Sequence, residues 1–202
     1  MTNVAPSDLQ LDALREVANI GCAHAVTALS RLVGGRKVQI DVPRVLVAKV
    51  SELPAMVGGE AAAAIAAQLA MHGQLTGHLL LVMPQADAAH LCTLLLERPC
   101  AEPLDAAAQS ALGEAANIVA SACLTAIGTL TGLRLMPSTP VLSQGPAGDL
   151  VAAAIADCAA DAGLVVVLEA HFQTDIAPAL GGRLLVLPHH ESLKALLKVL
   201  GV

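Results

Sequence analysis

The sequence predicts an α+β fold in which two long helices pack on a largely antiparallel β-sheet. Three observations support this prediction: two long helical segments, short aliphatic runs bounded by Gly or Pro, and a repeated order of helix, strands and short helix. Because this order occurs twice in 202 residues, we expect a single domain over 1–202. Its two repeats would span about 1–100 and 101–202.

The strongest sign of the repeat is a pair of polar residues that returns 98 positions later, from 16 to 114. The two pairs are Glu16 with Asn19, and Glu114 with Asn117. A single Glu-x-x-Asn is common on the solvated face of a helix, but two copies in one register are hard to explain by chance. The residues around them also match, for example Thr27 and Thr125. Duplication followed by divergence is the simplest explanation.

Both pairs fall in segments with recognisable helix ends. Ser7 and Gln10 have the spacing of a capping box, and Gly34–Gly35 provides a stop. In the second half, Pro103 suits a first helical turn and Gly132 suits a stop. We therefore expect two long helices.

Each expected helix has a polar side and an apolar side. At about 100° per residue, Leu14 and Val17 fall opposite the polar residues of the first helix. The polar residues that share one sector are Asp12, Glu16 and Asn19 in the first helix, and Ser110, Glu114 and Asn117 in the second. The periodicity predicts that both polar sides face solvent.

Short aliphatic segments between the helices are typical of strands. Residues 38–42 alternate in polarity, whereas 79–83, 165–168 and 184–187 are continuous apolar runs. The segment 61–69 is ambiguous, because its propensity is helical while its place before a glycine turn resembles the first strand of a hairpin. A short helix is expected after the strands of each half.

Composition excludes several classes of function. The chain is 55% hydrophobic with one Phe and no Trp or Tyr, so an aliphatic, alanine-rich core is expected. The formal net charge of −6 and the lack of aromatic residues argue against a nucleic-acid partner. The five cysteines are odd in number and show no Cys-x-x-Cys, which predicts reduced, buried thiols.

Membrane association is also not expected. The longest apolar stretch, 61–71, contains Gln68 and is shorter than the roughly 20 residues that span a bilayer. The first residues lack the basic and apolar segments of a signal peptide. These features predict a cytoplasmic protein.

The sequence offers little chemistry of its own. His189, His190 and Glu191 are clustered, but adjacent helical residues do not face one ligand position. No nucleophile elbow or phosphate-binding loop is present in the sequence. We expect neither a metal nor a cofactor bound by this chain. Exposed Glu and Asn side chains could instead position a water or a partner's side chain, so the chemistry would be completed on another protein.

The pattern Asp/Ser-x-x-x-Glu-x-x-Asn followed by a proline resembles the CheC, CheX and FliY phosphatases of chemotaxis. The second copy, which ends at Pro140, matches that spacing, and the first has one extra residue before Pro43. We therefore expect Asn117 to contribute more activity than Asn19. Two motifs in one chain of this length resemble CheC more than CheX or FliY.

The resemblance implies dephosphorylation of the aspartyl phosphate of CheY, a response regulator that carries its own Mg²⁺. Asn19 and Asn117 would orient the attacking water, and Glu16 and Glu114 would pair with the regulator's lysine. Asp12 and Ser110 would be further partner contacts. Two alternatives remain open: an adaptor that binds the receptor deamidase CheD, and a non-enzymatic relative of the flagellar switch.

Overall fold

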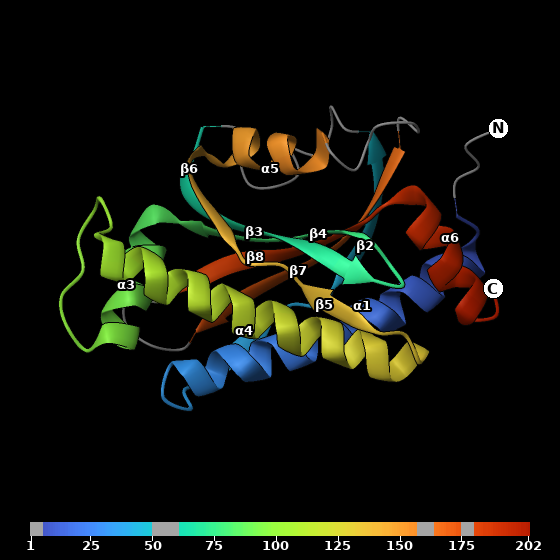
Figure 1. Ribbon diagram of the computed structural model, residues 1–202, viewed down its shortest axis with the longest axis horizontal. Helices are drawn as coiled ribbons and strands as arrows, with labels where there is room; N and C mark the ends of the chain where they lie inside the picture. Colours follow the sequence, from blue (N-terminus) through green and yellow to red (C-terminus); the bar gives the residue numbers. More distant parts are fainter. Residues whose placement is uncertain (1–5, 50–60, 157–163, 175–179) are drawn as a thin grey trace.

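A computed structural model describes residues 6–49, 61–156, 164–174 and 180–202 (Figure 1). The helices are α1 (Asp8–Leu32), α3 (Gln85–Leu96), α4 (Ala106–Thr131), α5 (Ala147–Ala156) and α6 (His190–Val199). The strands are β1 (Val38–Ile40), β2 (Arg44–Lys49), β3 (Ala63–Gly73), β4 (Gly77–Pro84), β5 (Leu135–Pro137), β6 (Val141–Pro146), β7 (Leu164–Thr174) and β8 (Gly181–Pro188). They form one eight-stranded sheet in the order β1-β7-β8-β4-β3-β5, with β2 beside β7 and β6 beside β3. The α+β prediction is confirmed.

The two long helices cover one face of the sheet and α5 covers part of the other (Figure 1). Helices α1 and α4 contact each other and run in opposite directions (Figure 1). Their approach is close, because a Cβ added at Gly21 would lie 3.0 Å from the Sγ of Cys123. The larger core, between these helices and the sheet, consists of aliphatic and sulfur-containing side chains together with the buried ring of Phe172. The close approach of the two helices thus fills space that large aromatic side chains would otherwise occupy.

The start of α1 follows the sequence prediction, whereas the start of α4 does not. Ser7 and Gln10 form the expected capping box. The expectation for Pro103 was wrong, because α4 begins after Asp105, whose side chain accepts a 2.8 Å hydrogen bond from the Ala108 N–H. A carboxylate that accepts a hydrogen bond from a free backbone N–H stabilises the first turn directly. A proline is only compatible with a first turn and adds no such hydrogen bond. Gly132, with a φ of +71°, ends α4 as expected.

The ambiguous segment 61–69 lies mostly in β3, so its place in the repeat was the better guide. The strand is buried on both sides, with Ala64 and Ala66 toward α5 and Ile65 and Ala67 toward the long helices. Burial between two layers favours the strand over the helical propensity of alanine. The expected strand at 38–42 is shorter, because β1 ends at Ile40.

Strand pairing links the two halves of the chain. β1 and β2 pair with β7, and β5 and β6 pair with β3, while β4 pairs with β8. If β1 to β4 are exchanged with β5 to β8 in order, the list of paired strands stays the same. This symmetry supports the two-repeat interpretation, which stays a prediction, and it shows that neither half completes its sheet alone.

Helix α4 is long and apolar enough to cross a membrane by length and composition, and half of its most apolar window is buried in the structure. Its contacts with α1, α3 and β5 account for that apolar character.

Three of the cysteines are buried thiols without a disulfide: Cys22, Cys92 and Cys123. Burial raises the pKa of Cys22 to about 12, so its thiol stays protonated near neutral pH. Cys100 is half-buried, and Cys158 lies outside the described residues.

Candidate active site on the two long helices

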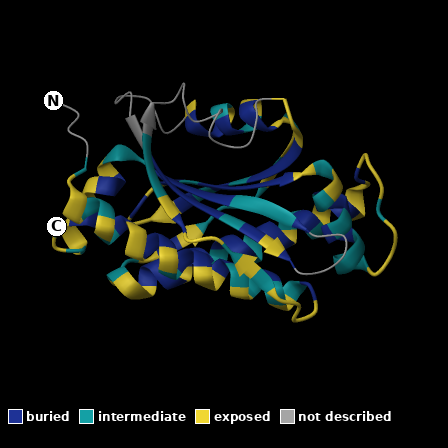
Figure 2. Ribbon diagram, turned by 180° about the vertical axis from the view of Figure 1, so that it is seen from behind, coloured by how far each residue is buried: buried dark blue, intermediate teal, exposed yellow. Residues whose placement is uncertain are grey.

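The two Glu/Asn pairs lie on α1 and α4, outside the set of residues that each helix buries in the core. Figure 2 shows that each long helix has a buried side and an exposed side. Glu16, Asn19 and Glu114 are exposed, and Asn117 is half-buried. The flanking residues Asp12 and Ser110 are exposed as well. The structure therefore brings together, on each helix, the three polar residues that periodicity places in one sector.

The two pairs form separate sites. Each lies in the first half of its helix, and the helices are antiparallel, so the pairs sit toward opposite ends of the helix pair (Figure 1). Within each site the Asn follows the Glu by three residues, which makes them neighbours on the helix surface.

The second site borders an open groove of about 530 Å³ between α4 and the turn from β5 to β6. The groove is lined by Gln109, Ser110, Gly113, Glu114, Asn117, Pro137, Ser138, Thr139, Pro140 and Leu142. Ser138 holds the turn in place, since its hydroxyl accepts a 2.9 Å hydrogen bond from the Ala70 N–H and donates one of 3.0 Å to the Thr139 carbonyl. A hydrogen-bonded turn thus forms one wall and a helix forms the other.

The motif side chains have no internal partner in the described part of the chain. No hydrogen bond or ion pair involves the side chains of Glu16, Asn19, Glu114 or Asn117 among those residues. Each amide keeps its donors and its acceptor for other molecules, and each carboxyl group is accessible to an external partner. Both sites are thus chemically available at the surface.

The first site differs by an ion pair beside its motif. The guanidinium of Arg15 contacts the carboxylate of Asp12, and their side chains are 52% and 68% exposed. In the second half the corresponding residues, 98 positions later, are Gly113 and Ser110. The two sites therefore share the Glu/Asn pair but differ in shape and in the charge next to it.

Strand bounds show that the two prolines occupy equivalent places. Pro43 immediately precedes β2, and Pro140 immediately precedes β6. β2 pairs with β7 as β6 pairs with β3. The extra residue of the first half therefore lies between the motif and the first strand: β1 begins 19 residues after Asn19, and β5 begins 18 residues after Asn117.

The sequence interpretation missed a charged cluster on the other face of the sheet. Glu169 has a fully buried side chain whose oxygens lie 2.9 Å from Arg44 Nη2, 2.9 Å from His171 Nε2 and 3.6 Å from Arg183 Nη1. An acid within the otherwise apolar start of β7 was the available signal. Pairing with three cationic or ionisable groups offsets the cost of burying the carboxylate.

The described residues hold no group of three or more His, Cys, Asp or Glu side chains placed to bind a metal ion. The motif side chains themselves offer an amide and a carboxylate but no nucleophile. Such a set can hold a water and a cation in place. The reacting group would have to come from a partner.

Comparisons with known proteins show the family of the chain. A model described as the CheC-like family matches residues 9–47, which contain the first motif, and one described as chemotaxis phosphatase CheX matches 65–158, which contain the second. The chain is 30% identical over 197 residues to the CheY-P phosphatase CheC of Bacillus subtilis (strain 168), covering 95% of this chain and 94% of that protein.

Solved structures show the same fold. Thermotoga maritima FliY has a TM-score of 0.75 at 20% identity, covering 97% of this chain and 98% of that one. FliM in the FliM-SpeE complex from H. pylori has a TM-score of 0.68 at 12% identity, covering 98% and 97%. CheX from Desulfovibrio desulfuricans has a TM-score of 0.56 at 15% identity, covering 85% and 97%.

Proposed function

The chain belongs to the CheC family, and from this membership we propose that it hydrolyses the aspartyl phosphate of a CheY-type response regulator. The observation that carries the proposal is the presence of two Glu/Asn pairs at the surface, one on each long helix, at the same spacing and without a side-chain partner among the described residues. A regulator of this kind works in the cytoplasm, where we place this protein.

The Asn side chains supply the positioning step. The amide of Asn19 or Asn117 would enter the regulator's site and hold a water in line with the phosphorus, as water-orienting side chains do in other phosphoryl transfers. The water oxygen then bonds to phosphorus while the bond from phosphorus to the regulator's aspartate oxygen breaks. The aspartate leaves as a carboxylate, and the water's proton goes to the released phosphate or to solvent. Mg²⁺ bound by the regulator would supply charge neutralisation for the transferred phosphoryl group.

The Glu side chains supply docking. Glu16 and Glu114 would each pair with a cationic side chain of the regulator, which fixes the orientation of the helix against that protein. Asp12 and Ser110 would contact the partner at the edge of each site. Orientation matters because the water must be held close to the line of attack.

The test is to replace both Asn residues with alanine in the full chain. Asn19→Ala with Asn117→Ala should lower phosphate release from the phosphorylated regulator with Mg²⁺ by about 100-fold or more, since a water that is not held in line reacts slowly. Binding should be largely retained, because most of the helix surface is unchanged. Steady-state phosphate release and a binding titration measure the two effects.

Thr27→Ala with Thr125→Ala is a matched control, because these exposed residues occupy equivalent places further along the same helices. It should leave activity unchanged. If excess wild-type protein does not speed the decay of the phosphorylated regulator, the phosphatase proposal is wrong.

A binding role is the second candidate, and the fold similarity to FliM is the observation that favours it. In that case the chain would be either an adaptor for a CheD-type deamidase or a non-enzymatic relative of the flagellar switch, and neither role would need the Glu/Asn pairs. A pull-down with CheD from the same organism separates the two functions. Binding that survives alanine at all four motif positions, in a chain without phosphatase activity, would support the adaptor role.

A further inference from the structure

We propose that the residue one helical turn before each motif Asn sets the access of the regulator to that site: Gly113 opens the second site, and Arg15 restricts the first. The inference rests on the proposed phosphatase function. It assigns a role in access to a position outside the Glu/Asn motif, and it predicts two sites of unequal affinity for the same partner.

Helix geometry places this position beside the amide. Gly113 precedes Asn117 by four residues and Arg15 precedes Asn19 by four, so each is the direct neighbour of its Asn on the helix surface. Any side chain there stands between the amide and the part of the partner that lies toward the start of the helix. A glycine leaves that approach open.

At the second site this absence of a side chain helps to form the groove. Gly113 lines the groove together with Asn117 and Pro140. A Cβ built at Gly113 would lie 3.7 Å from the Cγ of Pro140, which is ordinary contact, so a longer side chain would extend into the groove. The hollow beside Asn117 therefore depends on glycine at this position.

At the first site the same position carries a long, tethered side chain. The guanidinium of Arg15 is ion-paired with Asp12, and these two residues replace the Gly113 and Ser110 of the other site. A partner that approaches Asn19 must displace this pair or dock over it. Ordering or moving such a side chain opposes binding, and it does so before any chemistry occurs.

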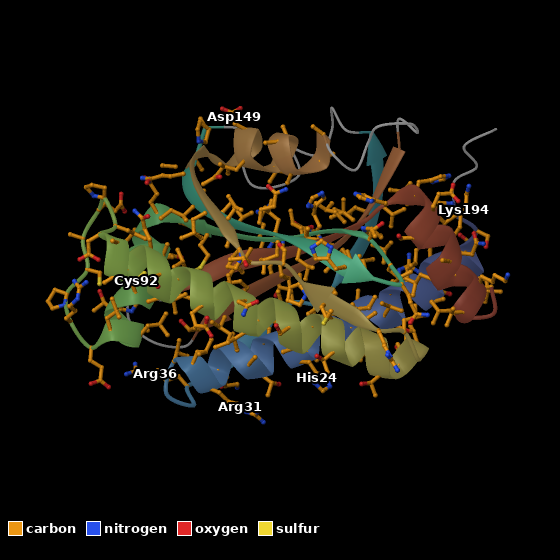
Figure 3. The ribbon with its side chains drawn as sticks, viewed as in Figure 1. His24, Arg31, Arg36, Cys92, Asp149 and Lys194 are labelled. Atoms are coloured by element: carbon orange, nitrogen blue, oxygen red, sulfur yellow. The ribbon has the colours of Figure 1, made fainter. Side chains whose placement is uncertain are left out.

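The first experiment isolates the first site by using Asn117→Ala as the background in the full chain. Adding Arg15→Ala should lower the KM for the phosphorylated regulator by about two- to tenfold, the effect of releasing one flexible side chain, with kcat nearly unchanged. Arg15→Lys should keep the high KM, because a long cation still reaches Asp12. Arg31→Ala is the matched control, since Arg31 points away from the molecule near the end of α1 (Figure 3); it should leave KM unchanged.

The reciprocal experiment isolates the second site with Asn19→Ala as the background. Gly113→Arg should raise KM by about two- to tenfold without lowering kcat to the same extent. Gly113→Ala should act in the same direction but more weakly. The Gly113→Ala variant also controls for misfolding, because an alanine side chain fits the available space and favours the helix.

The outcomes separate this inference from the function on which it rests. If the wild type and both single-site backgrounds all fail to hydrolyse the phosphorylated regulator, the proposed function is wrong. If the backgrounds are active and Arg15→Ala leaves KM unchanged or raises it, the access role is wrong. The access role also fails if Arg15→Ala has an equal effect in the background where only the second site is intact, since the change would then act through the fold.

Discussion

At the scale of single residues, the proposed function assigns different roles to the two members of each motif, because their side chains differ in charge. An Asn amide can donate and accept hydrogen bonds without charge, which suits the holding of a water. A Glu carboxylate with no internal partner attracts a cation over a distance of about a Debye length. Two neighbouring residues on one helix surface would therefore have separate roles: the Asn in positioning the water, and the Glu in binding the partner.

This difference leads to a prediction for the carboxylates. Glu16→Ala with Glu114→Ala should raise the Kd for the phosphorylated regulator by about three- to tenfold, because an intermolecular charge pair is lost. Wild-type binding should weaken as salt is raised, and the variant should respond less because it has fewer charges to screen. Binding titrations at low and high NaCl measure both effects. Equal salt dependence in the two proteins would mean that these Glu residues make no charge pair with the partner.

At the scale of elements, the start of α4 fixes the helix that carries the second site. Asp105 caps this helix, and the hydrogen bond from the Ala108 N–H, together with the Arg98 guanidinium 2.7 Å away, lowers the pKa of the Asp105 carboxyl below its ordinary value. The charged carboxylate is thus favoured in the folded state. The stability that it contributes is fully present above the unfolded pKa of 3.8 and is lost as the pH falls through the lower folded pKa.

Asp105→Asn tests this linkage, because Asn keeps an acceptor at the cap but removes the charge. The variant should have a lower free energy of unfolding than the wild type at pH 7, and the difference should shrink as the pH is lowered below about 4. Urea denaturation at several pH values measures this difference. A difference that stays constant down to pH 2 would show that the charge is not responsible.

At the scale of the whole molecule, the sheet makes the two halves dependent on each other. Within the described residues, β1 and β2 pair only with β7, and β5 and β6 pair only with β3. The most extensive helix contact, between α1 and α4, also joins the halves. Each half alone would expose strand edges and the apolar sides of its helix.

Expression of the two halves separately checks this dependence. Fragments 1–100 and 101–202 should each be poorly folded alone, and should regain secondary structure and a single cooperative unfolding transition when mixed. Circular dichroism and size-exclusion chromatography of the separate and mixed fragments provide the measurement. A half that unfolds cooperatively alone would contradict the prediction of one domain built from two interdependent repeats.

The sequence by itself determined the features that depend on local spacing. Periodicity identified the long helices and the exposed side that carries Glu16 and Glu114, because a helix places residues three and four apart on one surface regardless of what it packs against. The capping box at Ser7 and the glycine stop after α4 were readable for the same reason.

Only the tertiary structure decided the features that depend on residues far apart in the chain. The strand character of β3 follows from burial between two layers, and the equivalence of Pro43 and Pro140 follows from their places directly before β2 and β6. The groove beside Asn117 requires the turn at 138–140 to meet Gly113. The burial of Glu169 requires Arg44, which lies 125 residues away. These contacts join distant segments, and the spacing of residues within one segment carries no record of them.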